Sequence, residues 1–398
     1  MPVSDTVIRV AAKGDGVTAS GRHVPLAAPA DEVALDGSVA AGPHHADPPC
    51  RHFPRCGGCQ LQHLDEETLA QFVRDRVVHA AEGQGVVAER VAEVHLSPPR
   101  TRRRASLRAI NGGGRPLIGF SEGGSHKVVD LRECHILEPQ LFALVEPLRE
   151  LLQPRRDRYA AEITLTLTDQ GIDCAFKGLS FDGLEPMESL LEFCRVHGLA
   201  RMTLDQGYGP EALWEPVPVT VGLSGMAVAF PAGAFLQATA DGEAALVGAA
   251  RAWLEGAAQV ADLFAGLGTF AFALAGPTKV LAAEAARDSH LACRAAAHRA
   301  HLPVEAVQRD LFRNPMRADE LRGFDGVVLD PPRAGAREQV LQLAASEVPR
   351  IVYISCNPSS WARDAKLLVA TGYRLAEVRP VGQFRWSTHV ELASLFVR

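Results

Sequence analysis

The chain has 398 residues, 47% of them hydrophobic and 22% charged, which is the composition of a globular protein long enough for two or three domains. Its formal net charge of −6 argues against a protein that binds polyanions irrespective of sequence, although a local patch such as the arginines at 100–108 can still contact nucleic acid. No apolar run is long enough to cross a membrane and the N-terminus lacks a signal-peptide pattern, so we expect no membrane association and a cytoplasmic location.

Residues 1–47 are expected to form a reduced β element. The segments VIRV and GRHVPL are short and largely apolar, and a Gly-Asp-Gly turn at 14–16 separates them. A closed barrel normally needs more strands than this stretch can hold. We therefore predict a reduced barrel or a flap on a larger body.

Residues 48–235 are expected to form a central α+β domain with an antiparallel sheet. Three cysteines stand at 50–59, and a helical pattern with an acidic start follows from about 64 to 93. From 101 to about 177, segments such as RASLRAI and AEITLTLTD predict strands joined by turns.

Residues 236–398 predict a Rossmann-like domain, which places the protein in the α/β class. Seven β-rich segments alternate with helical patterns, and this alternation is the signal for a doubly wound parallel sheet. The last two segments, 373–381 and 389–397, are joined by a short connection, so we expect the seventh strand to run antiparallel to the others. Seven strands with a reversed last one are the pattern of Rossmann-like methyltransferases.

A glycine-rich turn and two acidic strand ends predict a nucleotide-type cofactor. Gly266 and Gly268 follow the strand-like segment 260–264 and precede a helix, where glycines allow the backbone to approach a ligand closely. Glu284 ends the second strand, where a carboxylate can accept both ribose hydroxyls, and Asp310 ends the third, within reach of an adenine edge. We favour S-adenosylmethionine over NAD because of the seven-strand pattern.

The sequence Asp330-Pro331-Pro332-Arg333 ends the fourth strand. Two prolines stiffen the backbone, so that its carbonyls and the aspartate carboxylate can be held toward a substrate. The same Asp-Pro-Pro, usually with an aromatic fourth residue, serves amino-group methyltransferases. Arg333 in the fourth place counts against methylation of a nitrogen.

Cys356 follows the buried strand-like segment 350–355, and Pro358 is well placed in the first turn of the next helix. Because the seventh strand is reversed, His389 and Glu391 at its start should lie at the same sheet edge as Cys356. A thiol and a base on opposite sides of a planar ring suit methylation at C5 of uracil, where the thiolate adds at C6 and the base removes the C5 proton. A cysteine thiol is mostly protonated at neutral pH, so a nearby positive charge is needed, and Arg333 is the candidate.

A second group of cysteines predicts a metal centre. Cys50, Cys56 and Cys59 are closely spaced, and Cys134 lies far downstream, a pattern that can bind zinc or an iron–sulfur cluster. Because these residues are remote in sequence from Cys356, we expect a structural or RNA-contacting role. The remaining thiols stand in apolar runs and are expected in the core: Cys174, Cys194 and Cys293.

Taken together, these motifs resemble the RNA uracil-5-methyltransferase family, specifically its iron–sulfur branch, which includes enzymes acting on 23S ribosomal RNA. The resemblance covers nearly the whole chain through CRHFPRCGGCQLQHL, GSHKVVDLRECHIL, FLQ at 235–237, DLFAGLGTF, DPPRAG, YISCNP and HVE. It also likens the segment 1–47 to a shortened TRAM domain, an OB-like barrel that binds RNA.

The resemblance implies roles for individual residues. It implies Cys356 as the nucleophile and Glu391 as the base that takes the C5 proton. A [4Fe–4S] cluster, with zinc as the less favoured alternative, is implied on Cys50, Cys56, Cys59 and Cys134. S-adenosylmethionine binding is implied for Gln237, Phe264, Thr269, Glu284, Asp310 and Asp330.

The chain departs from the family pattern at three places. Thr239 replaces the last residue of the FxQxN motif, Thr269 stands where members often have Asn, and residues 384–388 lack the usual proline and histidine before HVE. Ribosomal RNA is the favoured partner because the transfer-RNA branch lacks the cysteine cluster, and we expect a monomer. The alternatives are a transfer-RNA uridine-5-methyltransferase, an amino-group methyltransferase of DNA or RNA, and a non-enzymatic iron–sulfur protein that binds RNA.

Overall fold

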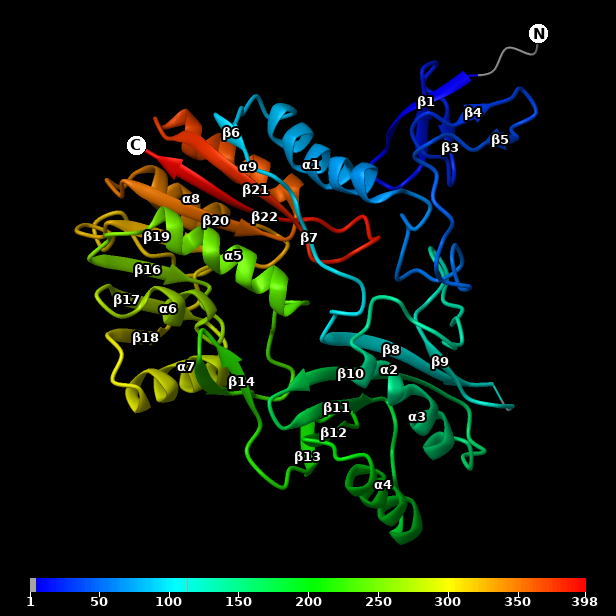
Figure 1. Ribbon diagram of the computed structural model, residues 1–398. Coiled ribbons are helices and arrows are strands. Elements are labelled where there is room, and N and C mark those ends of the chain that lie inside the picture. The colour runs from blue at the N-terminus through cyan, green and yellow to red at the C-terminus, as the bar shows by residue number, and fades with distance from the viewer. Residues whose placement is uncertain (1–4, 113) are drawn as a thin grey trace.

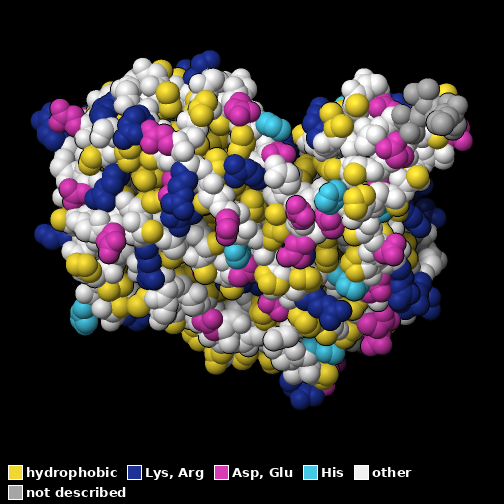
Figure 2. Space-filling model, turned by 45° about the horizontal axis from the view of Figure 1, so that its top comes forward, with side chains coloured by type: hydrophobic (Ala, Val, Ile, Leu, Met, Phe, Trp, Pro, Cys, Tyr) yellow, Lys and Arg dark blue, Asp and Glu magenta, His cyan; other side chains and the backbone are white. Residues whose placement is uncertain are grey.

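The computed structural model describes residues 5–112 and 114–398, which form a small N-terminal β-sheet, a central antiparallel sheet with helices, and a C-terminal Rossmann-like sheet (Figure 1). Among the described residues, no helix is both long and apolar enough to cross a membrane. On the face shown in Figure 2, Lys and Arg side chains are interspersed with Asp and Glu, which agrees with the modest negative net charge.

The N-terminal sheet has the strand order β3-β2-β1-β4-β5 and packs around a small core that includes Val7, Ala27 and Val33. Buried Asp31 organises its turns, because the carboxylate accepts backbone hydrogen bonds from Ala28 and Gly42 at 2.8 and 2.7 Å. The strands are β1 (Asp5–Val10), β2 (Gly16–Thr18), β3 (His23–Val24), β4 (Glu32–Val33) and β5 (Val39–Ala40).

Helix α1 (Glu66–Glu82) begins at Asp65, whose side chain accepts the Thr68 amide, and packs against helix α9 (Pro358–Ala370) and strand β21 (Arg374–Gly382). The predicted helix from 64 to 93 was too long. Its last part instead forms the two-residue strands β6 (Arg90–Val91) and β7 (His95–Leu96), which pair in parallel with β21.

The central sheet has the order β13-β12-β11-β10-β8-β9, and its pairs are antiparallel except β11 with β12. In β8, Ala105, Leu107 and Ala109 are buried while their neighbours face outward, as expected of a sheet with one covered face. The strands are β8 (Arg104–Asn111), β9 (Leu117–Gly119), β10 (Tyr159–Thr168), β11 (Gly171–Lys177), β12 (Arg201–Asp205) and β13 (Pro210–Trp214). The helices of this part are α2 (Pro139–Ala143), α3 (Val145–Leu152) and α4 (Leu184–Val196).

The Rossmann-like sheet confirms the predicted seven strands and the reversed last strand. Its order is β18-β17-β16-β19-β20-β22-β21, with β6 and β7 added beside β21. The first five strands are parallel, and β22 runs antiparallel between β20 and β21. The remaining strands are β16 (Gln259–Leu263), β17 (Lys279–Glu284), β18 (Val304–Gln308), β19 (Gly326–Leu329), β20 (Arg350–Ser355) and β22 (Glu391–Val397).

Helices cover both faces of this sheet. Helix α5 (Ala240–Trp253) packs on β20, β21 and β22 beside α6 (Thr269–Leu274), whereas α8 (Arg337–Ala344) and α9 pack together with α1 on the other face. Helix α7 (Arg287–Arg299) covers β17 and β18 and contacts the hairpin of β14 (Thr220–Leu223) and β15 (Met226–Ala229) through β15. The strands β19 and β20 are almost wholly buried, which explains their continuous apolar sequences.

Candidate active site

Cys356 lies at the carboxyl end of β20, half-buried in the turn that leads to α9. The Asn357 side chain accepts the Ser359 amide and so begins the helix, with Pro358 in its first turn. The same side chain donates to the Arg333 carbonyl at 2.9 Å, which Ser360 also contacts at 3.0 Å. The turn after β19 is thereby fixed against the turn that carries Cys356.

Glu391 is the first residue of β22 and lies beside Cys356 because of the strand register. Ser355 at the end of β20 is paired with Leu392, so the residues that follow one and precede the other are neighbours. Glu391 is 4% exposed, which makes it a buried carboxylate at the sheet edge where the parallel strands end. Residues 35 positions apart in sequence are thus brought together, as the reversed seventh strand predicts.

Both groups are held in their neutral forms by their surroundings. Burial, followed by the carboxylates of Glu391 and Asp330, raises the pKa of Cys356 to about 11, and Arg333 opposes the rise. Burial and then Asp330 raise the pKa of Glu391 to about 8, against a hydrogen bond from Gln383 and the charge of Arg333. Arg333 does favour the thiolate, as expected, but it does not outweigh burial and the two carboxylates.

The glycine-rich turn between β16 and α6 has an unusual backbone. Phe264, Gly266 and Gly268 have φ angles of +65°, +56° and +95°, in the left-handed region that a non-glycine residue such as Phe264 rarely adopts. A Cβ atom at Gly268 would lie 2.8 Å from the Cys293 sulfur, so only glycine fits there. Thr269 begins α6 directly after this turn.

Acidic side chains fix the turn from two sides. Glu284, at the end of β17, accepts the backbone amides of Gly266 at 2.9 Å and Ala286 at 2.7 Å. Asp262, fully buried in β16, accepts the Ala271 amide at 2.8 Å, while its other oxygen has no hydrogen-bond partner among the residues that the structure describes. Burial, with Asp330 as the next cause, raises the pKa of Asp262 to about 8.

Asp330, whose charge acts on the Cys356 thiol, is hydrogen-bonded to Gln237. The Gln237 amide donates to Asp330 at 3.3 Å, and burial raises the pKa of Asp330 to about 7. Thr239, which departs from the family pattern, caps helix α5 by accepting the Gly242 amide at 3.0 Å. Threonine is one of the side chains suited to this position, so the departure keeps the helix start intact.

Asp310 lies two residues beyond the end of β18 instead of ending the strand. Its carboxylate accepts the Phe312 amide at 3.0 Å and lies 3.5 Å from the guanidinium of Arg313. The Phe312 ring packs against Phe264 with ring centroids 5.3 Å apart. The residues predicted for the cofactor therefore gather along the edge formed by β16, β17, β18 and β19.

The four cysteines predicted to hold a metal centre line one pocket. Its empty volume, including the part open to solvent, is about 310 Å³, and its lining includes Cys50, Cys56, Cys59 and Cys134. Burial raises the pKa of all four thiols, to about 11 for Cys56 and about 12 for Cys59. Within residues 5–112 and 114–398, no set of three or more His, Cys, Asp or Glu side chains has an arrangement that would hold a single metal ion.

The cysteine segment is hydrogen-bonded to the loop that precedes Glu391. The backbone amides of Gln60 and Leu61 both donate to the Trp386 carbonyl, at 2.8 and 2.9 Å, and the Thr388 amide donates to the Gln60 side chain. The cysteine segment and the loop before Glu391 are therefore close in space although they are far apart in sequence.

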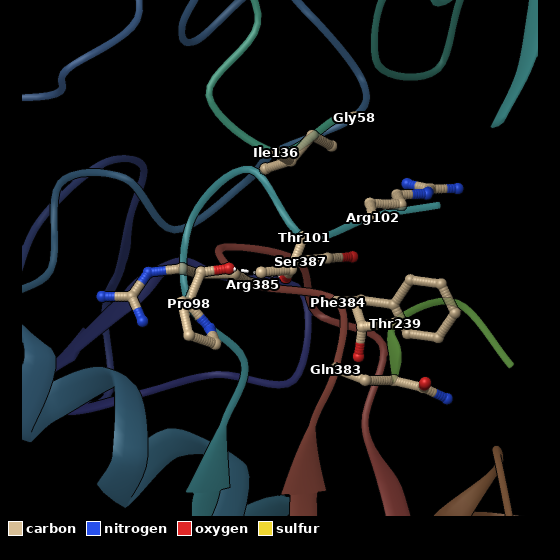
Figure 3. Close-up of a pocket in the computed structure, with 10 residues that line it drawn as sticks. All are labelled: Gly58, Pro98, Thr101, Arg102, Ile136, Thr239, Gln383, Phe384, Arg385 and Ser387. Atoms are coloured by element: carbon tan, nitrogen blue, oxygen red, sulfur yellow. Dashed lines mark hydrogen bonds between the residues drawn. The ribbon is translucent and has the colours of Figure 1, made fainter. Parts of the chain in front are cut away.

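Arg102 bridges the same two regions. Its guanidinium lies over the ring of Phe120, which lines the cysteine pocket, and over the ring of Phe384 in the loop after β21, at 5.9 and 5.4 Å from the centroids. Figure 3 shows Arg102 above the Phe384 ring in a neighbouring pocket that Thr239 and Gln383 also line. The cysteine pocket and the edge that carries Glu391 are thus adjacent.

Three residues of this region are not among the sequence predictions. Asp262 stands inside an apolar strand as a buried acid, which is a recognisable signal once it is sought. Phe312 and Gln383 carry no motif, and only the tertiary structure places them beside Phe264 and Gln237.

The chain is similar to known RNA methyltransferases. Residues 219–398 match the tRNA (uracil-5-)-methyltransferase family. An uncharacterized RNA methyltransferase of Zymomonas mobilis is 47% identical over 98% of this chain and 99% of its own length. The 23S rRNA uracil-C5-methyltransferase RlmD of Chromohalobacter salexigens is 33% identical over 92% of this chain and 80% of its own length.

A solved structure shares the fold over the whole chain. The tRNA (uracil-54, C5)-methyltransferase of Pyrococcus abyssi, in complex with S-adenosyl-L-homocysteine, superposes with a TM-score of 0.77 over 99% of both chains at 22% identity. The chain belongs to the family of S-adenosylmethionine-dependent RNA uracil-5-methyltransferases, and it is accordingly an enzyme.

Proposed function

We propose that this enzyme methylates C5 of a uridine in ribosomal RNA, with Cys356 as the nucleophile and Glu391 as the base. The observation that carries the proposal is the pairing of β20 with β22, which brings a thiol and a buried carboxylate to one sheet edge beside Asp330. Transfer RNA is the alternative substrate. Ribosomal RNA is favoured because of the four-cysteine pocket and the similarity to RlmD.

In the proposed reaction Cys356 acts in addition and in elimination, and Glu391 acts once, in removal of the C5 proton. C5 of uracil is too weak a nucleophile by itself, so the Cys356 thiolate adds to C6 and forms a C6–S bond and an enolate. S-adenosylmethionine, when bound, supplies an electrophilic methyl group to C5 and leaves as S-adenosylhomocysteine. The Glu391 carboxylate then removes the C5 proton, the C–H electrons restore the C5–C6 double bond, and the C6–S bond breaks to return the thiolate.

Both groups must ionise against their surroundings for this reaction. Arg333 is the cation that acts on both, and it favours the thiolate of Cys356 as well as the carboxylate of Glu391. We therefore assign Arg333 to thiolate stabilisation.

The edge beside Cys356 fits an adenosine-type donor. In the left-handed turn, the space where a Cβ of Gly266 would stand is open, so a ligand can approach the backbone there, and buried acids lie beside it. The residues proposed to hold S-adenosylmethionine are Gln237, Phe264, Thr269, Glu284, Asp310 and Asp330.

We propose a [4Fe–4S] cluster for the cysteine pocket, with zinc as the alternative. A tetrahedral zinc site with Zn–S distances of about 2.3 Å needs sulfur atoms about 4 Å apart. The four thiols share one pocket without the convergence a single ion requires among the described residues, and a cluster holds its ligands farther apart. We propose that Cys50, Cys56, Cys59 and Cys134 hold the cluster.

The reaction is tested with a Glu391→Gln variant. The amide cannot take the C5 proton, so a methylated covalent complex of protein and RNA should accumulate on denaturing gels, and Cys356→Ala should form none. The matched control is Glu377→Gln, which changes a carboxylate of the same sheet that lies beside Trp253 and Arg379. Normal turnover by the Glu391→Gln enzyme would contradict the assignment of the base, and full activity of Cys356→Ala would favour an amino-group methyltransferase.

The substrate is tested by nucleoside mass spectrometry of ribosomal and transfer RNA from cells with and without the protein. Loss of one 5-methyluridine from ribosomal RNA is expected, and its loss from transfer RNA alone would overturn the favoured substrate.

The cluster is tested by iron and sulfide analysis after anaerobic purification. Cys59→Ala should lose both elements, whereas Cys194→Ala, which removes a buried thiol elsewhere, should keep them. Zinc without sulfide would overturn the cluster. A monomeric state and a cytoplasmic location stay predictions from the sequence.

A further inference from the structure

Gln383 is a buried amide that the proposed mechanism does not use. It follows β21 in the loop before Glu391, and only 2% of its surface is exposed. Figure 3 shows it beside Thr239 at the floor of the pocket that Arg102 and Phe384 also line. A buried polar side chain is costly unless its groups are hydrogen-bonded, so its partners define its role.

The Gln383 side chain interacts with two residues of the site. Its Nε2 atom donates to Gln237 Oε1 at 2.9 Å. Gln383 also lies two residues beyond Val381, the strand partner of Glu391, and from there its amide favours the ionised form of the Glu391 carboxylate. A primary amide has two N–H donors, so the second N–H is available to Glu391. With its oxygen engaged by Gln383, Gln237 turns its own amide nitrogen toward Asp330.

The opposite end of the amide fixes this orientation. Gln383 Oε1 is buried without a hydrogen-bond partner in the described part of the chain, and it lies over the first turn of α5, where a Cβ at Gly242 would be 3.0 Å away. The positive end of the helix dipole favours an oxygen there. A flipped amide would instead direct Oε1 at the Gln237 oxygen and the Glu391 carboxylate, so acceptor would face acceptor.

We infer that Gln383 is a positioning residue that couples the base Glu391 to Gln237 and Asp330 in the cofactor crevice. It holds the Gln237 amide in one orientation and keeps the Glu391 carboxylate directed at the reacting uridine. This inference rests on the proposed function, because it takes Glu391 as the base and Gln237 as a cofactor residue. It predicts that one substitution changes both cofactor binding and proton removal.

The charged groups around Glu391 set the sign of the effect on proton removal. Asp330 at the end of β19 disfavours the Glu391 carboxylate, Arg333 favours it, and the neighbouring thiol of Cys356 is neutral in the free enzyme. Loss of the Gln383 interaction makes the ionised form of Glu391 less stable and so raises its pKa. The proton-removal step should then require a higher pH.

The test compares Gln383→Met with Gln339→Met. Methionine keeps the length and removes the donors, and Gln339 is an equally buried amide that instead bonds to the backbone of Met316. The readouts are calorimetric binding of S-adenosylhomocysteine and the pH midpoint of adduct breakdown on total ribosomal RNA from cells lacking the protein. Gln383→Met should weaken binding about tenfold and raise the midpoint by about one pH unit, whereas Gln339→Met should change neither.

A second variant perturbs Gln383 without removing its amide. In Gly242→Ala, the new Cβ would lie 2.7 Å from the Gln383 Cβ and 2.7 Å from the Thr239 hydroxyl, so Gln383 must move. Both readouts should shift in the same direction as in Gln383→Met. Unchanged affinity and midpoint in Gln383→Met, or equal changes in Gln339→Met, overturn the inference. If Glu391→Gln still accumulates the adduct in that case, the inference fails alone and the proposed function stands.

Discussion

The pH dependence of Cys356 alkylation gives a direct measure of how the free enzyme holds its nucleophile. Burial and two carboxylates raise the pKa of this thiol from 9.0 to about 11. At pH 8 about one molecule in a thousand would then carry the thiolate, against about one in ten for an ordinary thiol, so alkylation should be about 100-fold slower.

The assay treats the enzyme with iodoacetamide between pH 7 and 10 and quantifies the modified Cys356 peptide by mass spectrometry. Steric access changes the absolute rate, so the shape of the profile is the readout. The wild-type rate should rise throughout this range without levelling off. Around pH 8 the rise should be shallower, because Glu391 ionises there and its charge raises the pKa of the thiol; at higher pH the rate should rise about tenfold per pH unit.

Two variants should move the profile in opposite directions. In Glu391→Gln the neighbouring charge is absent, so the profile should exceed that of the wild type above about pH 8, where Glu391 ionises, and should level off about one pH unit earlier. In Arg333→Met the rates should fall because a favourable charge is lost. A wild-type profile that levels off below pH 9, or identical profiles for both variants, would refute the argument that burial and these charges control the thiol.

Three further predictions concern stability and cofactor binding. Folding raises the pKa of Asp262 from 3.8 to about 8, so its contribution to stability is complete below about pH 4 and is lost as the pH rises through 8; Asp262→Asn should raise the melting temperature more at pH 9 than at pH 5. Gly268→Ala, whose Cβ would meet Phe272 at 2.7 Å, should destabilise the fold by about 1–3 kcal/mol in urea unfolding and weaken S-adenosylhomocysteine binding in calorimetry. Arg201→Met should cost about 3–5 kcal/mol in the same unfolding assay, because it leaves the buried carboxylate of Asp173 unpaired, and a loss below 1 kcal/mol would contradict that reading.

The sequence predicts much of the catalytic half because its signals are local and regular. Buried strands such as β20 are short apolar runs that end at helix-starting residues, and strand direction follows from connection length. The proximity of Cys356 and Glu391 then follows from topology, since a reversed last strand must begin where the parallel strands end. The strands and their directions can both be predicted from patterns that extend over only a few residues.

Other features depend on contacts that no local pattern records. The strands β6 and β7 have two residues each, too few for a hydrophobic period, and form only because β21 offers an open edge. The contact between the cysteine segment and Trp386 spans more than 300 residues of sequence. Gln383 acquires its role through Gln237, 146 positions away, so its significance is visible only in the folded chain.

The pairing of β6 and β7 with β21 has a consequence for how the catalytic unit can be isolated. A fragment that starts near residue 236 would contain all seven strands of the Rossmann-like sheet, but β21 would become an edge with unpaired backbone groups. Helix α1 would also be missing, which would expose apolar surface on α9. Exposed edges and apolar faces of this kind promote self-association. By covering them, the residues around 66–96 protect the catalytic sheet from aggregation.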